Sequence, residues 1–220
     1  MDSTFRRVYL QYFRLGETAY REKVRYYEEN PDEIAALYFD DRLDIDFDYL
    51  YCLFEVGRYE RFLSKVDPFI ELIVVENIYE FRNENIYHEL LFRKAACLYQ
   101  MKQFSKSEEI LRQLTRMNRQ NPLFIGLYTI CKRKIENDIF TTIKALAMAA
   151  ILIVIGITVA RIFLEPFFDV YMASFLILRS VLIGFAVCCL LGLEVAFQFK
   201  IRQETGMFSH HLLNKIFGTE

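Results

Sequence analysis

The first 138 residues place apolar and polar side chains at the spacing of amphipathic helices. From Phe5 to Tyr27, apolar side chains recur at steps of three and four residues, which puts them on one helical face. Asn30-Pro31 ends this helix, because proline lacks an amide hydrogen and disfavours helical geometry in the residue before it. The pattern therefore predicts one long N-terminal helix, followed by a weaker helix from Pro31.

Two helical hairpins are predicted further along this domain. Within residues 47–63, one helix closes at Gly57 and the next opens directly after it, as in a tight helix–helix turn. Residues 86–114 repeat the layout, with the turn at Lys102-Gln103. Asn121-Pro122 then begins another helix, since proline is well tolerated in a first helical turn. The sequence thus predicts an all-α domain over residues 1–138.

The second hairpin carries a family resemblance. A small Ala95 stands where two helices approach, an aromatic Phe104 follows the turn, and Pro122 ends the unit. These residues resemble the tetratricopeptide-repeat family, and Tyr59 resembles the same aromatic position in an earlier repeat. Tyr59 and Phe104 are 45 positions apart, whereas the family period is about 34. We therefore expect two or three irregular repeats. The resemblance implies a scaffold whose concave face binds a peptide or helix of a cytosolic protein partner.

Two long apolar segments follow the helical domain. Residues 145–160 contain no charge, and the segment extends through Leu164 to about 20 residues, enough to cross a hydrocarbon core of about 30 Å. After Glu165-Pro166, a second apolar run continues to Phe199. We expect spans at about 143–164 and 173–199 in a transmembrane hairpin covering residues 139–200. A cytosolic amphipathic tail is expected over residues 201–220.

Basic residues set the expected orientation of this hairpin. They flank its two ends but are scarce in the connection, where only Arg161 occurs; the flanking residues are Lys132, Arg133, Lys134, Lys144, Lys200 and Arg202. The positive-inside rule places both termini in the cytoplasm, and the N-terminal sequence lacks the pattern of a secretory signal. A bacterial inner membrane fits this arrangement best. The net charge of −2 disfavours nucleic acid as a partner.

Small residues recur along both spans. They are spaced by four positions and are Gly156 and Ala160 in the first span and Ser180, Gly184, Cys188 and Gly192 in the second. Such faces let helix backbones approach closely. They serve packing within one hairpin or packing between protomers of a homo-oligomer, and the sequence supports both interpretations equally.

Two charged residues interrupt the second span. If that span starts near Val170, Arg179 lies about 14 Å deep, which indicates a water-lined oligomeric pathway. Alternatively, the span starts at Ser180, and Arg179 extends its side chain to the head groups. The second interpretation is favoured because Glu194 must also lie near an interface.

Candidate chemistry is sparse. No nucleophile elbow, phosphate loop or metalloprotease motif occurs, and no catalytic, metal or cofactor site is expected. Arg82 and His88 resemble the Arg-polar…His signature of HEPN-type ribonucleases, although a polar turn capping the helix at Ile86 explains the same residues. The five cysteines lack metal-ligand spacing and are expected to be reduced thiols; they are Cys52, Cys97, Cys131, Cys188 and Cys189.

Three hypotheses for function remain. A membrane-anchored helical-repeat scaffold that binds a cytosolic protein or peptide explains the most residues. An oligomeric channel or membrane-disrupting effector, similar to small two-span accessory proteins of bacterial defence systems, depends on Arg179 and the small-residue faces. A membrane-bound ribonuclease depends on Arg82 and His88.

Overall fold

The computed structural model describes residues 2–78, 80–81, 84–164 and 172–208. These residues form ten helices and one pair of two-residue strands, which confirms the predicted all-α class. They divide into two compact units, Met1–Ile110 and Leu111–Glu220. The division falls inside one helix, α7 (Phe104–Met117).

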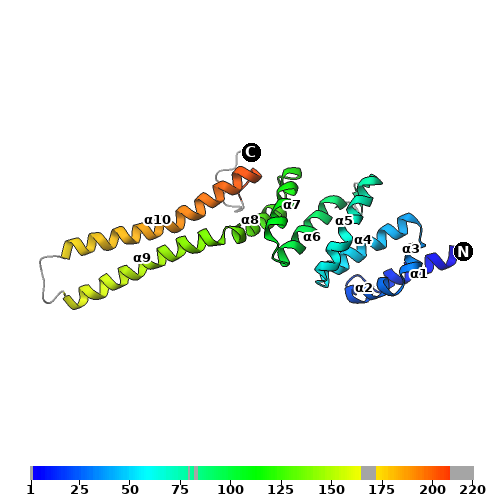
Figure 1. Cartoon of the computed structure of the whole chain (residues 1–220), viewed down its shortest axis with the longest axis horizontal. Helices are drawn as coiled ribbons and strands as arrows, with labels where there is room; N and C mark the ends of the chain where they lie inside the picture. Colours follow the sequence, from blue (N-terminus) through cyan, green and yellow to red (C-terminus); the bar gives the residue numbers. More distant parts are fainter. Residues whose placement is uncertain (1, 79, 82–83, 165–171, 209–220) are drawn as a thin grey trace. The chain divides into compact units, whose positions relative to one another are not determined.

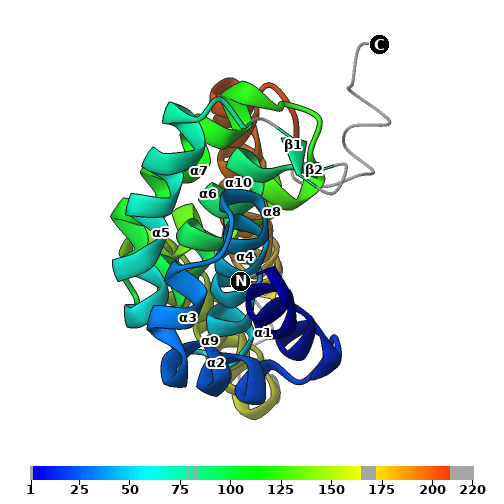
Figure 2. The ribbon, with the colours of Figure 1, turned by 90° about the vertical axis from the view of Figure 1, so that its right-hand side faces the viewer.

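The first unit is a stack of helices. Its elements are α1 (Asp2–Arg14), α2 (Tyr20–Glu29), α3 (Pro31–Ala35), α4 (Phe39–Glu55), α5 (Tyr59–Val75), β1 (Glu80–Phe81), β2 (Glu84–Asn85), α6 (Ile86–Gln100) and the start of α7. Helix α2 packs on α4, α4 on α5, and α5 on α6, an order that can be followed in Figures 1 and 2. The antiparallel strands β1 and β2 pair just before α6.

The prediction of one long N-terminal helix is wrong. The chain leaves helical geometry after Arg14 and re-enters it at Tyr20, with Gly16 at a φ of 91°. Only glycine adopts this left-handed conformation without a steric penalty. The apolar period continues across the break because both helices bury one face: Tyr12 packs in one cluster with Val8, while Val24 belongs to the larger core.

Helices α4, α5 and α6 end in the same kind of turn. The second residue past the end of each helix has a positive φ, which is 80° at Gly57, 58° at Asn77 and 61° at Lys102. In each case the next amide donates to a carbonyl five residues back, from Arg58 to Leu53, from Ile78 to Ile73 and from Gln103 to Leu98. This is the hydrogen-bond pattern of a Schellman motif. The turns predicted at Gly57 and Lys102-Gln103 are confirmed.

Asparagine side chains begin two of the helices. The Asn85 side chain accepts a hydrogen bond from the His88 amide at 3.0 Å, so α6 starts at Ile86 as predicted. Asn121 accepts from the Leu123 amide at 3.0 Å and begins α8 (Pro122–Ile135). Both side chains satisfy amides that have no partner inside the helix.

Large aromatic and aliphatic side chains form the core of the first unit. Its most deeply buried members include Tyr49, Leu53, Phe62, Val66, Ile73, Ile86 and Leu90. The rings of Tyr27 and Tyr49 stack with centroids 3.7 Å apart and tie α2 to α4. Two tyrosines of the first unit, Tyr12 and Tyr49, are themselves buried in its core.

The second unit contains two long apolar helices. Helices α9 (Asn137–Leu164) and α10 (Met172–Thr205) lie side by side in opposite directions (Figure 1). Each contains a segment long and apolar enough to cross a membrane, Asn137–Ala160 and Ile177–Thr205. Only 11% of the most apolar window of each is buried. A core helix of a soluble protein would instead be mostly buried.

Polar contacts join the end of α10 to α8 and the start of α9. Tyr128 donates a hydrogen bond to Glu204 at 2.5 Å, and buried Lys132 forms an ion pair with the same carboxylate. Lys200 pairs with Glu136 at 2.5 Å. Nearby, the rings of Phe140 and Phe197 meet edge to face with centroids 5.0 Å apart. These contacts fix the register of α9 against α10.

Candidate functional site

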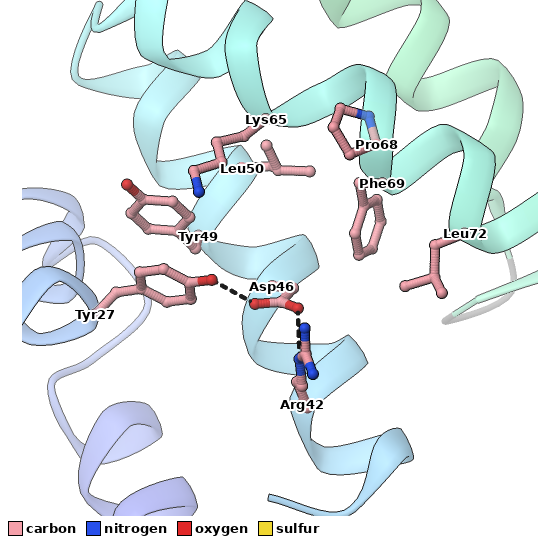
Figure 3. A pocket seen from close by; sticks show the side chains of 9 residues that line it. All are labelled: Tyr27, Arg42, Asp46, Tyr49, Leu50, Lys65, Pro68, Phe69 and Leu72. Carbon is pink, nitrogen blue, oxygen red and sulfur yellow. Dashed lines mark hydrogen bonds and ion pairs between the residues drawn. The ribbon is translucent and has the colours of Figure 1, made fainter. Parts of the chain in front are cut away.

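A groove opens on the first unit between α2, α4 and α5. Its volume is about 190 Å³, and its lining residues are Tyr27, Arg42, Asp46, Tyr49, Leu50, Lys65, Pro68, Phe69 and Leu72. Figure 3 shows the polar groups of Tyr27, Asp46 and Arg42 on one side and the apolar side chains of α5 on the other. The groove therefore offers an apolar wall beside a polar one.

The polar wall is internally bonded. The Tyr27 hydroxyl donates to Asp46 at 2.7 Å, and Arg42 lies 3.4 Å from the other oxygen of the same carboxylate. Burial, with Asp46 nearby, raises the pKa of Tyr27 well above its usual range, so this tyrosine stays a neutral donor. Because Asp46 is held from both sides, it keeps one orientation at the groove.

The apolar wall comes from α4 and α5. Leu50 and Phe69 are buried in the core, while Leu72 is half-buried and Pro68 is exposed. Lys65 extends from α5 toward the ring of Tyr49 (Figure 3) and is exposed. Among the residues that the structure describes, Lys65 has no ion-pair partner. The groove thus presents one cation that is available to a bound carboxylate.

A buried polar network lies behind the groove. Lys23 is only 3% exposed and forms an ion pair with Asp48 at 2.9 Å, while the Tyr12 hydroxyl donates to the same carboxylate at 3.0 Å. This network joins α1 and α2 to α4 and so positions Tyr27 at the groove. Sequence reasoning missed it, although one signal was present: a lysine on the apolar side of α2, directly before Val24.

The thiol of Cys52 also lies against this network, 3.6 Å from Asp48. Burial, with Asp48 nearby, raises the pKa of Cys52 to about 12. Because the thiolate is the reactive form, this cysteine is chemically inert at neutral pH. No disulfide joins the five cysteines, all of which lie in the described part of the chain: Cys52, Cys97 and Cys131 are buried, whereas Cys188 is exposed and Cys189 is half-buried.

The small residues singled out in the two spans face outward. Gly156, Ala160, Ser180, Gly184, Cys188 and Gly192 are all exposed. A Cβ built on Gly156, Gly184 or Gly192 would meet no described atom within 4 Å. Instead, Ala147 and Ala150 pack against Ala186 where α9 meets α10. This small-residue face therefore makes no contact within the described hairpin, and its packing between protomers stays a prediction.

Arg179 lies in the second turn of α10, two residues past the start of the segment apolar enough to cross a membrane. Counted from the contacts of Ala186 and Phe197 at 1.5 Å per residue, it is level with about residue 155 of α9. It lies roughly 10 Å from the start of α10 at Met172. Arg179 is half-buried and has no ion pair within the described residues. Whether it lines a pathway or reaches the head groups stays a prediction.

Glu194 lies at the other end of the apolar part, where it is paired. Its carboxylate accepts from Arg133 at 2.6 Å and from the Gln198 side chain at 3.2 Å. The Arg133 guanidinium also lies over the rings of Phe140 and Phe197. The position of Glu194 next to basic groups fits an interfacial location.

The remaining candidates concern catalysis and metals. Arg82 lies outside the described residues, and His88 lies in the first turn of α6. The ribonuclease hypothesis therefore stays a prediction. Within residues 2–78, 80–81, 84–164 and 172–208, no group of three His, Cys, Asp or Glu side chains could hold a metal ion.

Comparisons with known proteins found no match: no protein-family model, no curated protein and no solved structure is similar to this chain. The resemblance to tetratricopeptide repeats therefore depends on Ala95, Phe104, Pro122 and Tyr59 alone and stays a prediction.

Proposed function

We propose that this protein is a membrane-anchored scaffold that docks a cytosolic protein partner in the groove between α2, α4 and α5. The observation that supports this proposal is the groove, in which Leu50 and Leu72 lie beside Lys65 and the hydrogen-bonded carboxylate of Asp46. Such a surface suits a peptide that presents an apolar side chain next to a carboxylate. The apolar side chain would gain burial, and the carboxylate would pair with Lys65.

The anchoring part of the proposal is supported by α9 and α10. Large apolar side chains remain exposed along both helices; they include Leu146, Met148, Leu152, Ile155, Ile162, Val181, Leu191 and Val195. An exposed apolar surface of this extent requires a cover, and a lipid bilayer supplies one along the whole length of both spans. Both termini are proposed to face the cytoplasm of a bacterial cell, because basic residues flank the hairpin.

A peptide selection tests the docking function. The full chain in detergent would be exposed to a displayed library of random dodecapeptides, with Lys65→Glu/Leu72→Asp as the counter-selected variant. We expect enrichment of peptides that combine an aliphatic or aromatic residue with Asp or Glu, and at least tenfold weaker binding of these peptides to the variant.

A matched control is available on the same helix. Glu71→Lys/Val75→Asp also changes one charged and one apolar residue of α5, but neither Glu71 nor Val75 lines the groove. Selected peptides should bind this control as tightly as the unaltered chain. Selection of no peptide, or of peptides that bind all three proteins equally, would refute docking at this groove.

The second candidate function is an oligomeric channel. It is favoured by the outward-facing small residues and by Arg179, which lies seven residues inside α10 and has no ion pair within the described residues. A charge at that depth is costly unless it meets water or a partner in the assembly. In this function the small-residue faces of several hairpins would meet and leave Arg179 on a shared polar path.

Dye and ion leakage from liposomes tests the channel. We expect reconstituted protein to release potassium ions, and Arg179→Leu to reduce the release at least fivefold without reducing the amount of inserted protein. Gly184→Leu should reduce it as well, because a bulky residue separates the faces. Absence of leakage at any protein density would refute the channel.

A further inference from the structure

A second pocket lies in the second unit, where α8, α9 and α10 meet. It has a volume of about 330 Å³, and its lining includes Arg133, Lys134, Lys144, Asn137, Thr129 and Gln198. Three of these side chains are cationic and none is acidic. The pocket is thus a concave basic site built from three helices.

The cations of this pocket differ in their pairing. Arg133 is held by Glu194 at 2.6 Å and by the rings of Phe140 and Phe197, so its guanidinium has a fixed place. Lys134 and Lys144 are exposed and have no ion-pair partner within the described part of the chain. After Glu194 is counted against Arg133, two positive charges remain for an occupant.

Gln198 adds an independent observation at this pocket. Its side chain is only 3% exposed, and its amide nitrogen donates to Glu194 at 3.2 Å, which fixes the orientation of the amide. The amide oxygen has no hydrogen-bond partner within the described residues. A buried acceptor without a donor is costly, so a donor supplied by a bound molecule would stabilise the site.

The location of the pocket selects the class of ligand. Lys144 directly precedes the uncharged segment 145–160 of α9. On α10, the acidic residue Glu194 lies four positions before Gln198, one turn away. If the hairpin spans a bilayer, this level is the boundary between hydrocarbon and head groups at the end where α9 begins and α10 ends. Basic pockets at that boundary bind anionic lipid head groups.

We infer that this pocket binds the head group of an anionic phospholipid. Lys134 and Lys144 hold the phosphate, Arg133 adds a fixed charge, and a head-group hydroxyl, as in phosphatidylglycerol, donates to the Gln198 oxygen. The acyl chains then run along the exposed apolar surface of α9. This inference rests on the membrane anchoring proposed above, but it does not require the docking groove.

Native mass spectrometry of the detergent-solubilised full chain tests the inference. The protein would be titrated with palmitoyl-oleoyl phosphatidylglycerol and, separately, with the phosphatidylcholine that has the same acyl chains. We expect one phosphatidylglycerol to bind at least tenfold more tightly than phosphatidylcholine. Lys134→Gln/Lys144→Gln should weaken phosphatidylglycerol binding roughly 10- to 30-fold, because two cations near a head group are lost.

The matched control is Lys102→Gln/Lys106→Gln, which removes the same charge from the first unit, outside both this pocket and the docking groove. It should bind phosphatidylglycerol like the unaltered chain. Equal binding of the two lipids, or equal weakening by both double variants, would overturn the inference. Displacement of the lipid by millimolar inorganic phosphate would also overturn it, because the site would then recognise a free anion.

A separate measurement distinguishes failure of the lipid site from failure of membrane anchoring. Alkaline carbonate extraction of membranes reports insertion, and the Lys134→Gln/Lys144→Gln variant should remain in the membrane fraction. Loss of lipid selectivity with retained insertion refutes only the lipid pocket. Extraction of the unaltered chain refutes the anchoring itself and with it the membrane level on which the pocket depends.

Discussion

The two units treat polar and apolar side chains in opposite ways. The first unit buries polar groups and pairs them: Lys23 is 3% exposed and bonded to Asp48. The hairpin of the second unit exposes its apolar groups, with Leu152 64% exposed, and keeps its pairs near the ends of α9 and α10. Both units are helical, but one buries its apolar side chains and the other exposes them.

This difference shows that helix content alone does not reveal whether a helix is surrounded by water or by lipid. In the first unit, water covers the outer surface, so apolar residues gather inside and a buried charge needs a partner. In the hairpin, the proposed lipid cover would remove the gain from burying apolar residues, so small Ala147, Ala150 and Ala186 would suffice for the contact. Four experiments test this contrast between the two units.

Alkaline pH should unfold the first unit and leave the hairpin helical. Burial raises the pKa of Tyr49 and of Cys97 to about 12, and it also raises the pKa of Tyr12 and Tyr27. Groups whose folded pKa is raised stabilise the fold at pH values below their unfolded pKa, and this stability is lost as the pH rises toward the folded value. We expect cooperative loss of part of the helical circular dichroism between pH 9 and 12.

Tyrosinate absorbance should rise in the same pH interval, because buried tyrosines ionise only on unfolding. The described parts of α9 and α10 contain no tyrosine, so their helical signal should persist. Tyr49→Phe should shift the transition to higher pH. Smooth tyrosine ionisation near pH 10 without loss of helix would contradict burial of these rings.

Removal of one partner of the buried ion pair should be the most damaging single substitution. Asp48→Ala leaves Lys23 buried without its counter-charge, which costs about 3–5 kcal/mol of unfolding free energy. Chemical denaturation followed by tyrosine fluorescence measures the loss. The double variant Lys23→Met/Asp48→Leu should recover most of it, because no buried charge remains; a double variant as unstable as Asp48→Ala would contradict this account.

A lysine placed at an exposed apolar position distinguishes a position that faces lipid from one that faces water. Leu152→Lys in α9 should cost about 2.5–3.5 kcal/mol of membrane insertion if that position faces lipid. Val75→Lys in α5 is the matched change at a position that is 79% exposed, and it should alter stability by less than about 0.5 kcal/mol. A translocon insertion assay and thermal melting give the two values. Two equally silent substitutions would argue that water surrounds the hairpin.

The smallest effects are expected at the helix-ending turns. Gly57 has a φ of 80°, so Gly57→Ala should destabilise the first unit by about 1 kcal/mol. Lys102 occupies the equivalent position with a φ of 61°, so Lys102→Gly should stabilise by up to about 1 kcal/mol. Opposite shifts in melting temperature are therefore expected, and shifts of the same sign would contradict the assigned turns.

Local signals made much of the fold predictable. Gly57, Asn85 and Asn121-Pro122 mark helix ends because each acts on backbone groups within a few residues. The two apolar segments were as easy to predict as these helix ends, because their length and their low number of charges can be read directly from the sequence. The error came at Gly16, where a turn interrupts a periodic pattern without disturbing it, because α1 and α2 each bury one face.

The candidate sites were less predictable than the helices. The docking groove joins Tyr27 of α2, Asp46 of α4 and Lys65 of α5, residues with no shared motif. The basic pocket was foreseen only as positive charge near the first span; the part played by Gln198 was not visible in the sequence. Each site depends on residues that come together only when helices pack.

The sequence by itself determined that this protein is helical, where several of its helices begin or end, and that two of them are apolar enough to cross a membrane. Tertiary structure alone decided that Lys23 finds Asp48, that Ala186 and not Gly184 meets α9, and that Arg133 meets Glu194. The physical reason is range. Helix propensity, capping and hydropathy act over a few neighbouring residues, whereas pairing and packing depend on which distant faces share the same space.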